Sequence, residues 1–357
     1  MPSFNLPTPC LLLDATTMRA NIASMNAAVR GRGAELRPHL KTAKSVEVAR
    51  AMTDGWSGAV TVSTLREAEA FFAAGCRDIL YAVGVAPGKL EQAQGLTARG
   101  ANLTLITDNV PAAEAIAEAG LPALIEIDSD GQRAGIAPDD SDRLLAVAAA
   151  LGRSLRGVMT HRGGSYAAAS PAELPGHAEA ERLAVLRAAE ILRAAGHGCP
   201  VVSVGSTPTA LFARDLSGVT EVRAGVYVFH DLVMAGLGVC SIDDIAISVL
   251  ATVIGHQPDK GWIVTDAGWM ALSRDPGRGD HGYGLVAGES DLIVTSANQE
   301  HGIVADRNGR PIDPARYPVG STLRILPNHA CATAAQHDRY HVIDGGKVGE
   351  WPRFGGW

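Results

Sequence analysis

The sequence predicts a (β/α)8 barrel of the TIM type followed by a mostly antiparallel β domain. Two observations lead to this fold class. In roughly the first two thirds of the chain, apolar runs of strand length alternate with Ala- and Leu-rich stretches of helical spacing, which is typical of parallel strands joined by right-handed crossovers. After residue 240, β-rich runs follow one another between Gly, Pro and Asp turns, with little helical periodicity.

The barrel prediction depends on the number and spacing of the strand candidates. Eight of them fall within about 200 residues, which fits a closed barrel. Stretches of helical spacing, such as 46–52, 65–74, 111–119 and 179–195, separate them. The alternative is an open, doubly wound sheet. The strand candidates are 35–41, 59–64, 78–84, 102–107, 123–128, 155–161, 201–206 and 221–229.

Composition limits the classes of function. The chain has 357 residues, 46% of them hydrophobic, which is enough for a large core and suggests two domains. A net charge of −7 gives no basic surface for nucleic acid. No apolar run is long enough to span a bilayer, and the first residues do not form a secretory signal. The five cysteines are scattered, without a Cys-x-x-Cys pair, which indicates a reduced, cytoplasmic protein.

Lys41 is the first candidate for a catalytic residue. It ends the first strand candidate, and catalytic residues of such barrels lie at the C-terminal ends of the strands. Arg37, His39 and Lys44 are close in sequence, and nearby positive charge favours the free amine. A free amine can form a Schiff base with an aldehyde cofactor. The alternative is an ordinary solvated basic cluster.

Polar residues also follow later strand candidates. Arg133 follows the fifth and His161 ends the sixth. At the end of the seventh, Ser206 and Thr207 open a helix, in which Pro208 fits the first helical position and Thr207 fits the N-cap. Free backbone amides and the helix dipole could bind an anion there, although a capped helix without a ligand has the same pattern.

The sharpest feature of the second domain is the pair His329 and Cys331. On an extended segment both side chains would point to one face, because the strand period is two. Two ligands are fewer than the three usual in catalytic zinc sites. A buried cysteine beside a partnered histidine therefore remains an alternative.

The segment Arg37–Lys44 carries a Pro-His-x-Lys-x-x-Lys pattern. It resembles the cofactor-lysine segment of the fold-type III pyridoxal-phosphate enzymes, and within them the D-serine dehydratase and D-threonine aldolase family. The resemblance extends over nearly the whole chain and implies an alanine racemase-like fold. It also implies that Lys41 holds pyridoxal 5'-phosphate and that Lys41 and His161 are the catalytic residues.

The resemblance assigns further residues to the cofactor. The turn after the seventh strand would hold the phosphate, and the segment 223–227 matches a second phosphate-contacting segment. The segment 126–135 closely resembles an Asp-x-Gly-x-x-Arg-x-Gly pattern whose arginine would lie near the phenolic oxygen of the cofactor. A histidine after the sixth strand would stack on the pyridine ring, with a tyrosine near it. The implied cofactor-binding residues are His39, Lys41, Arg133, His161, Tyr166, Gly205, Ser206, Thr207, Gly225 and Tyr227.

The resemblance also favours a metal site. Dehydratases of the family bind zinc through His-x-Cys, whereas the aldolases more often show His-x-Asp with harder ions, a division that follows ligand softness. His329 and Cys331 therefore imply a divalent metal, zinc first, with manganese or magnesium as alternatives. Aldolases often carry a second histidine where Gly164 stands, which also favours elimination.

The leading hypothesis is a metal-dependent lyase that dehydrates and deaminates a β-hydroxy D-amino acid to a keto acid and ammonia. Retro-aldol cleavage to glycine and an aldehyde is the first alternative. An amino-acid racemase and a non-catalytic pyridoxal-phosphate carrier are further alternatives. The side chain at Cβ stays open, and Arg162 is a candidate for binding an acidic one. No nucleic acid or membrane partner is expected, and the family implies a homodimer.

The domain boundaries follow from the same comparison. In the resembled family the chain starts in the β domain before entering the barrel. We therefore expect the barrel at 14–240, and the β domain with the metal ligands at 1–13 and 241–357. The β-rich runs of that domain are 247–254, 262–265, 291–296 and 322–325, and a Gly- and Asp-rich stretch at 275–284 predicts a mobile loop.

Overall fold

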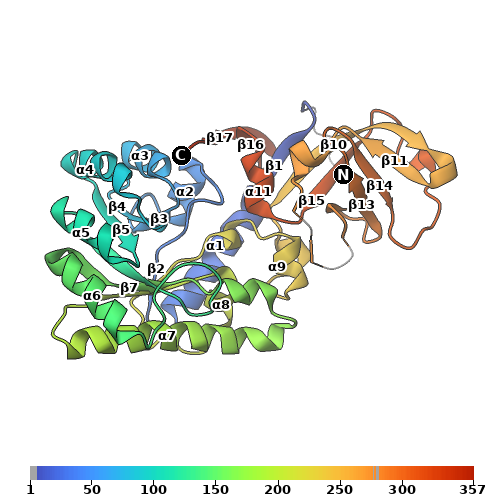
Figure 1. Ribbon diagram of the computed structural model, residues 1–357. Coiled ribbons are helices and arrows are strands. Elements are labelled where there is room, and N and C mark those ends of the chain that lie inside the picture. The colour runs from blue at the N-terminus through green and yellow to red at the C-terminus, as the bar shows by residue number, and fades with distance from the viewer. Residues whose placement is uncertain (1–5, 276, 279–280) are drawn as a thin grey trace. The chain divides into compact units, whose positions relative to one another are not determined.

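The computed structural model divides the chain into two compact units. One consists of Ile22–Tyr227 with Gly356–Trp357, and the other of Met1–Asn21 with Val228–Gly355 (Figure 1). The units are called the barrel unit and the β unit below, and each is described separately. The residues described are 6–275, 277–278 and 281–357. The predicted mobile loop at 275–284 includes residues 276, 279 and 280, which lie outside the described residues.

The barrel unit contains one sheet of eight strands in the order β2-β9-β8-β7-β6-β5-β4-β3, and its strand pairs are parallel. Backbone contacts join the two ends of this order. His39, after β2, bridges Thr61 of β3, and the Leu40 N–H donates to the Thr61 carbonyl at 2.8 Å. The sheet is therefore the predicted barrel and not an open sheet. The strands are β2 (Glu35–Leu36), β3 (Val60–Val62), β4 (Asp78–Tyr81), β5 (Asn102–Thr107), β6 (Ala123–Ile127), β7 (Leu155–Thr160), β8 (Val201–Val204) and β9 (Glu221–Val222).

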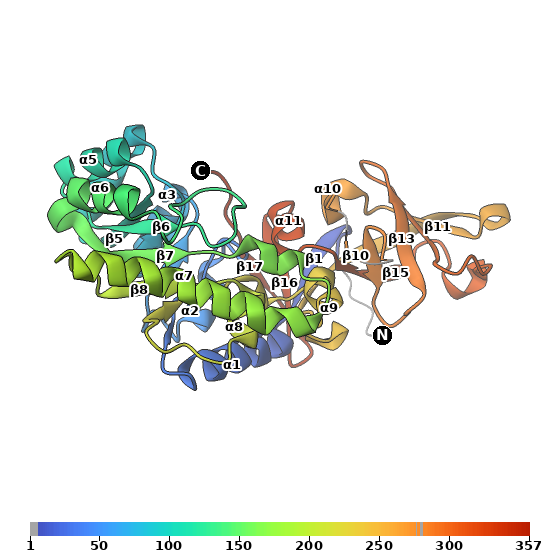
Figure 2. The same ribbon diagram turned by 60° about the horizontal axis from the view of Figure 1, so that its bottom comes forward.

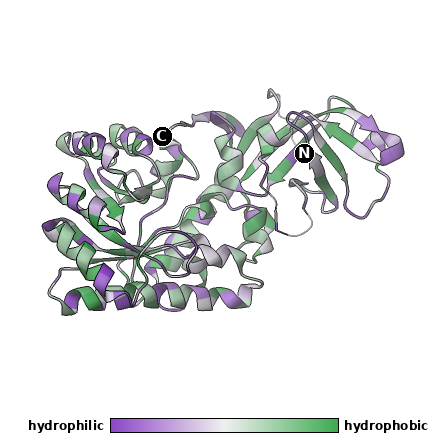
Figure 3. Cartoon of the chain, in the orientation of Figure 1, coloured by the Kyte–Doolittle hydropathy of each residue, from purple (hydrophilic) through white to green (hydrophobic). Residues whose placement is uncertain are grey.

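Helices cover the outside of this barrel (Figure 1). Side chains cap the N-termini of several of these helices: Thr64 accepts from the Glu67 N–H at 3.0 Å, and Asn109 accepts from the Ala112 N–H at 3.0 Å. The longest helix, α7, lies along β7 and β8 (Figure 2). Hydrophobic and hydrophilic residues alternate along these helices, as expected when one face packs on the sheet (Figure 3). The helices are α1 (Ala15–Arg30), which belongs to the barrel unit only from Ile22 on, α2 (Val46–Met52), α3 (Leu65–Ala73), α4 (Leu90–Ala98), α5 (Val110–Glu118), α6 (Ser141–Leu151), α7 (Leu174–Ala194) and α8 (Thr207–Phe212).

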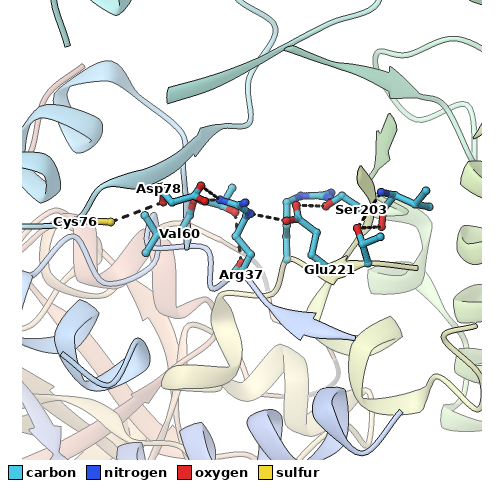
Figure 4. Close-up of polar contacts among 10 residues, drawn as sticks. Arg37, Val60, Cys76, Asp78, Ser203 and Glu221 are labelled. Carbon is cyan, nitrogen blue, oxygen red and sulfur yellow. Dashed lines mark hydrogen bonds and ion pairs between the residues drawn. The ribbon is translucent and has the colours of Figure 1, made fainter. Parts of the chain in front are cut away.

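An ionic network joins Arg37, which follows β2, to residues of β4, β8 and β9 (Figure 4). Arg37 donates through Nε to Glu221 and through Nη1 to Asp78, both at 2.7 Å. Ser203 of β8 donates to the same Glu221 carboxylate at 2.7 Å. Because Glu221 is buried, its negative charge needs these partners. The network ties β2, β4, β8 and β9 together.

The β unit is built on a nine-stranded sheet in the order β11-β14-β13-β12-β15-β10-β1-β16-β17. Its pairings are antiparallel except for β1 with β16. This confirms the mostly antiparallel character predicted for the second domain. No helix in the described parts of the chain is long and apolar enough to cross a membrane. The elements of this unit are β1 (Cys10–Asp14), α9 (Leu232–Gly236), β10 (Ile247–Gln257), β11 (Trp262–Thr265), α10 (Trp269–Leu272), β12 (Gly284–Val286), β13 (Leu292–Ala297), β14 (Gly302–Asp306), β15 (Thr322–Pro327), α11 (Ala330–Ala335), β16 (Arg339–Asp344) and β17 (Lys347–Pro352).

Candidate active site

The predicted cofactor residues all lie in the barrel unit, beyond the C-terminal ends of its strands. His39 and Lys41 follow β2, Arg133 follows β6, and His161 follows β7. Tyr166 also follows β7, the turn at 205–207 follows β8, and Gly225 and Tyr227 follow β9. Contacts described below connect these segments into one site at the carboxyl edge of the barrel, where such folds place their chemistry. The predicted metal pair lies in the β unit.

Lys41 presents an exposed side chain, and its Nζ has no hydrogen-bond or ion-pair partner in the described part of the chain. Its backbone N–H donates to His39 Nδ1 at 3.4 Å. Burial, reinforced by the positive charges of Lys41 and Arg223, holds the pKa of His39 well below its usual range. His39 is therefore a neutral hydrogen-bond acceptor beside the lysine.

Two of the charges expected to act on Lys41 are compensated. Arg37 is paired with carboxylates at the start of the strands, and Lys44 Nζ lies 3.2 Å from the Glu67 carboxylate. The expected positive neighbourhood of Arg37 and Lys44 is thus wrong, because buried carboxylates on neighbouring elements neutralise both.

His161 is held by the next strand end. Its Nδ1 lies 2.6 Å from the Gly205 carbonyl oxygen, so Nδ1 carries the proton and donates. Burial lowers the pKa of His161 to about 3, with Arg133 and Lys41 adding to the effect and the Gly205 carbonyl opposing it. The ring is therefore neutral at physiological pH, with Nε2 unprotonated. The ring of Tyr166 lies 6.1 Å away, centroid to centroid.

The turn after β8 starts helix α8 one residue earlier than predicted. Ser206, not Thr207, is the N-cap: its backbone is extended and its side chain accepts from the Thr209 N–H at 3.2 Å. Thr207 is the first helical residue, and its Oγ1 accepts from the Tyr227 N–H at 3.2 Å. This bond joins the segment after β9 to the turn.

Glycines at two of the predicted positions allow close approach of backbones. Gly205 has φ +152°, and a Cβ there would lie 2.0 Å from the Arg223 carbonyl oxygen. A Cβ on Gly225 would lie 2.7 Å from the His39 carbonyl oxygen. Larger residues at either position would separate the strand ends that carry the site.

Sequence reasoning missed Arg223, which is buried inside this region. Its guanidinium donates to Ser203 Oγ and to the Thr160 carbonyl. Burial lowers the pKa of Arg223 to about 10, and nearby Glu221 and Glu181 oppose that shift. An arginine between apolar residues of a predicted strand is a signal that could have identified it.

A second missed residue is Glu181 of α7, a buried carboxylate behind the site. Its Oε1 accepts from the Arg162 N–H at 2.9 Å. Burial raises the pKa of Glu181, and a hydrogen bond from the Thr209 side chain opposes the shift. One carboxylate thus joins α7 to the segments after β7 and β8.

The two arginines singled out in the sequence have different surroundings. Arg133 is half-exposed, and its guanidinium lies 3.5 Å from the buried Glu126 carboxylate. Arg162 donates to the Ser129 carbonyl and to His177 Nδ1 of α7. Arg162 is therefore occupied in holding the segment after β6 against α7, which weakens it as a candidate for binding an acidic substrate.

These surroundings fit pyridoxal phosphate. An amine without a partner lies at the strand ends, and the turn at 205–207 offers amides and hydroxyls of the kind that bind phosphate. The Oη of Tyr227 is buried and has no hydrogen-bond partner among the described residues. A buried hydroxyl normally has such a partner, so an oxygen of a bound ligand would complete the site.

The β unit holds His329 and Cys331 together, although not as predicted. His329 is the extended N-cap of α11, and Cys331 lies in the first turn of that helix, so the segment is not a strand. A hydrogen bond with Cys331 is the largest cause of a pKa of about 9 for His329, with burial opposing and Asp275 adding to the effect. His329 Nδ1 also contacts the Asp275 carboxylate. The described residues contain no group of three or more protein ligands.

Comparison with known proteins covers both units. Residues 13–232 match the family described as "Alanine racemase, N-terminal domain", and residues 246–343 match "Putative serine dehydratase domain". The chain is 53% identical to D-threo-3-hydroxyaspartate dehydratase of Delftia sp. (strain HT23), covering 99% of this chain and 98% of that protein. It is 32% identical to D-serine dehydratase of Dictyostelium discoideum, covering 95% and 94%, and 30% identical to D-threonine aldolase of an Arthrobacter species, covering 97% and 92%.

Solved structures agree with this comparison. The Delftia dehydratase superposes with a TM-score of 0.96 at 52% identity over 99% of both chains. A D-threo-3-hydroxyaspartate dehydratase with a cysteine-to-alanine substitution, described as the metal-free form, superposes with the same TM-score of 0.96.

Proposed function

We propose that this protein dehydrates β-hydroxy D-amino acids to a keto acid and ammonia. The chain belongs to the family of fold-type III pyridoxal-phosphate enzymes that join an alanine racemase N-terminal domain to a serine dehydratase domain. The observation that carries the proposal is the 53% identity to a D-threo-3-hydroxyaspartate dehydratase over nearly all of both chains. Two observations support it: Lys41 and the turn after β8 both follow C-terminal ends of barrel strands, and His329 is hydrogen-bonded with Cys331.

When bound, pyridoxal phosphate supplies an electron sink for negative charge at Cα, and the divalent metal ion makes the β-hydroxyl a better leaving group. Lys41 would hold the cofactor through Nζ and then, once released by the substrate amine, take the Cα proton. Its lack of a carboxylate partner leaves Nζ free for both tasks.

The remaining barrel residues would position the cofactor. Gly205, Ser206 and Thr207, with Gly225 and Tyr227, would hold the phosphate through amides and hydroxyls. His161 would face the pyridine ring as a neutral imidazole, because its proton is fixed on Nδ1 by the Gly205 carbonyl. Arg133 would place a positive charge near the phenolic oxygen. His39 and Tyr166 would line the site beside Lys41 and His161, respectively.

His329 and Cys331 would bind the metal ion. Thiolate and imidazole together suit zinc better than manganese or magnesium. Because the protein supplies two ligands within the described residues, water and substrate oxygens would complete the coordination, and this leaves room for the β-hydroxyl.

The same relatives suggest the substrate class. A dicarboxylic substrate, D-threo-3-hydroxyaspartate, is the first candidate, since its dehydratase is the relative with 53% identity. Loss of water from it gives an enamine, whose hydrolysis releases oxaloacetate and ammonia. D-Serine, which would give pyruvate and ammonia, is the second candidate.

Retro-aldol cleavage is the competing function, and similarity to D-threonine aldolase at 30% identity favours it. That reaction needs a base for the β-hydroxyl proton, and Gly164 cannot provide one. A racemase would have no use for the His329 and Cys331 pair. A non-catalytic carrier would have no use for the nine-stranded sheet of the β unit.

We further propose that residues 14–240 form the cofactor domain and that 1–13 with 241–357 form the metal domain. A cytoplasmic location is part of the proposal, because none of the five cysteines, all of them among the described residues, forms a disulfide. A homodimer is expected from the family alone.

Two measurements on the purified protein test the function. The visible absorbance of bound cofactor should be present in the wild type and absent after Lys41→Ala. D-Threo-3-hydroxyaspartate, D-serine and D-threonine should then be assayed for keto acid with and without a chelator. Keto acid formed at an unchanged rate after complete metal removal would exclude the proposed role of His329 and Cys331.

A further inference from the structure

Two aspartates surround the metal pair without belonging to it. Asp231 ends the segment before α9, and Asp275 lies in the segment after α10. Both are in the β unit, as are His329 and Cys331. Neither aspartate is among the residues that the sequence predicted to bind the cofactor or the metal.

Asp231 is buried and uses both carboxylate oxygens. Its Oδ1 accepts from the Met234 N–H at 2.9 Å and so caps α9. Its Oδ2 accepts from the Ala330 N–H, also at 2.9 Å, and Ala330 is the residue between the two metal ligands. The Asp231 side chain therefore accepts hydrogen bonds from the first turns of both α9 and α11, and it fixes the backbone that carries His329 and Cys331.

The residue before the pair is fixed at the same place. The Asn328 carbonyl accepts from the Val233 N–H of α9 at 3.2 Å. Asn328 Nδ2 donates to the Asp275 carbonyl at 3.2 Å and to the Gly282 carbonyl at 2.7 Å. Asn328 is itself buried. The backbone of Asp275 is thus anchored to the residue adjoining His329.

The side chain of Asp275 contacts His329 at Nδ1. A carboxylate accepts a proton-bearing Nδ1, which leaves the lone pair of Nε2 as the metal-binding site. Such a contact fixes both the tautomer and the rotation of the ring, and it makes the imidazole a stronger ligand. With two protein ligands in the described residues, accurate placement of each matters more than in a site with four.

We propose that Asp231 and Asp275 are positioning residues for the metal pair: Asp275 presents Nε2 of His329 to the ion, and Asp231 fixes the backbone from which His329 and Cys331 project. This inference rests on the proposed function for the identity of the two ligands. It assigns no contact with substrate to either aspartate.

The test measures Zn²⁺ affinity by competition with a chelating dye, on cofactor-loaded protein stripped of metal. Asp275→Asn should weaken Zn²⁺ binding by about 10- to 100-fold, the range seen when such partners of ligands are removed. Asp338→Asn is the matched control, because Asp338 is an exposed aspartate of the same unit whose carboxylate pairs with Arg339. The control should bind Zn²⁺ as the wild type does.

Two further readouts separate positioning from general damage. The unfolding midpoint of metal-free Asp275→Asn should match the wild type, and its Co²⁺ form should keep the thiolate-to-metal absorption of Cys331. Asp231→Asn keeps one acceptor oxygen but loses the other, so it should lower both the unfolding midpoint and Zn²⁺ affinity. If Asp231→Asn fails to fold, Asp275→Asn alone decides.

Wild-type Zn²⁺ affinity in Asp275→Asn would overturn the inference, as would loss of the cobalt–thiolate absorption from that variant. The proposed function fails in a different way. In that case Zn²⁺ would bind the wild type as tightly as ever and Asp275→Asn would still weaken it, but no β-hydroxy D-amino acid would be consumed. If His329→Ala left Zn²⁺ binding unchanged, the site itself would be misassigned and the inference would fall with it.

Discussion

Gly205→Ala should open the barrel at the phosphate turn. The added Cβ would lie 2.0 Å from the carbonyl oxygen of Arg223, 2.5 Å from its carbonyl carbon and 2.6 Å from its nitrogen. All three atoms are backbone, so no side chain can rotate to make room. The adjacent hydrogen bond, from Arg223 N–H to the Val204 carbonyl at 2.7 Å, holds the two segments at this separation.

The size of the effect follows from two costs. Relief of the contacts requires the backbones to separate by about 1 Å or more, and such overpacking typically costs about 1–3 kcal/mol. The φ of +152° is one that alanine rarely adopts, which adds about 1–3 kcal/mol. A combined loss of about 4 kcal/mol corresponds to a fall in Tm of about 8–16 °C for a domain of this size. Because the turn also carries Ser206 and Thr207, cofactor content should fall as well.

Thermal unfolding and the amount of cofactor retained after gel filtration measure both effects. Gly84→Ala is the matched control: Gly84 follows β4, is exposed, and would have no atom within 4 Å of an added Cβ. The control should change stability by less than about 0.5 kcal/mol. A Gly205→Ala protein with wild-type Tm and full cofactor content would refute the close approach of these two segments.

Three other predictions concern charge and metal. His161 has a pKa of about 3 in the folded protein, against 6.5 for a free histidine. Between these two pH values the unfolded chain binds a proton that the folded chain does not, so the free energy of unfolding falls as the pH falls. Relative to His161→Gln, the wild type should lose about 2–3 kcal/mol of unfolding free energy on going from pH 7.5 to 4.5. Equal pH dependence of the two proteins in denaturant titrations would contradict a buried, neutral His161. Glu221→Gln should lower the free energy of unfolding by about 3 kcal/mol because Arg37 loses a buried partner. Asp215→Asn, which removes the exposed partner of Arg182, should leave stability nearly unchanged, and similar losses in both variants would argue against the network. Cys331→Asp should shift the metal that best restores activity after chelation from Zn²⁺ toward Mn²⁺, and an unchanged preference for Zn²⁺ would speak against Cys331 as a ligand.

Local hydrophobic pattern was sufficient for most of the barrel. The run 102–107 is β5 residue for residue, and 123–128 differs from β6 at one end. The first and last barrel strands are shorter than predicted, because Pro38 cannot donate a ladder hydrogen bond and the backbone turns at 226–228. In both cases the residues predicted to extend the strand adopt irregular backbone instead, and these residues carry the candidate site.

The sequence did not predict the strands β12, β14, β16 and β17 of the β unit. The run 347–352 contains Gly349 and Pro352 and is almost wholly exposed, so it lacks the alternation that marks a half-buried strand. It is a strand because it pairs with β16 from Arg339 to Asp344. That pairing is a tertiary contact, and the pattern of the segment itself does not contain it.

The site residues divide in the same way. Lys41 and the turn at 205–207 were identifiable because strand ends and helix starts have local signals. The pairing of Arg37 with Asp78 and Glu221 was not, since its partners come from strands far along the chain. His329 and Cys331 were correctly associated for the wrong reason: a helix start brings them together, not an extended segment.

The most direct measurement supplies D-threo-3-hydroxyaspartate to the zinc-loaded protein and quantifies every product. Elimination at Cβ predicts one oxaloacetate and one ammonia for each substrate consumed, with no turnover by Lys41→Ala. Glycine and glyoxylate in their place would show that the Cα–Cβ bond breaks instead, and would contradict the assignment of this chain as a dehydratase.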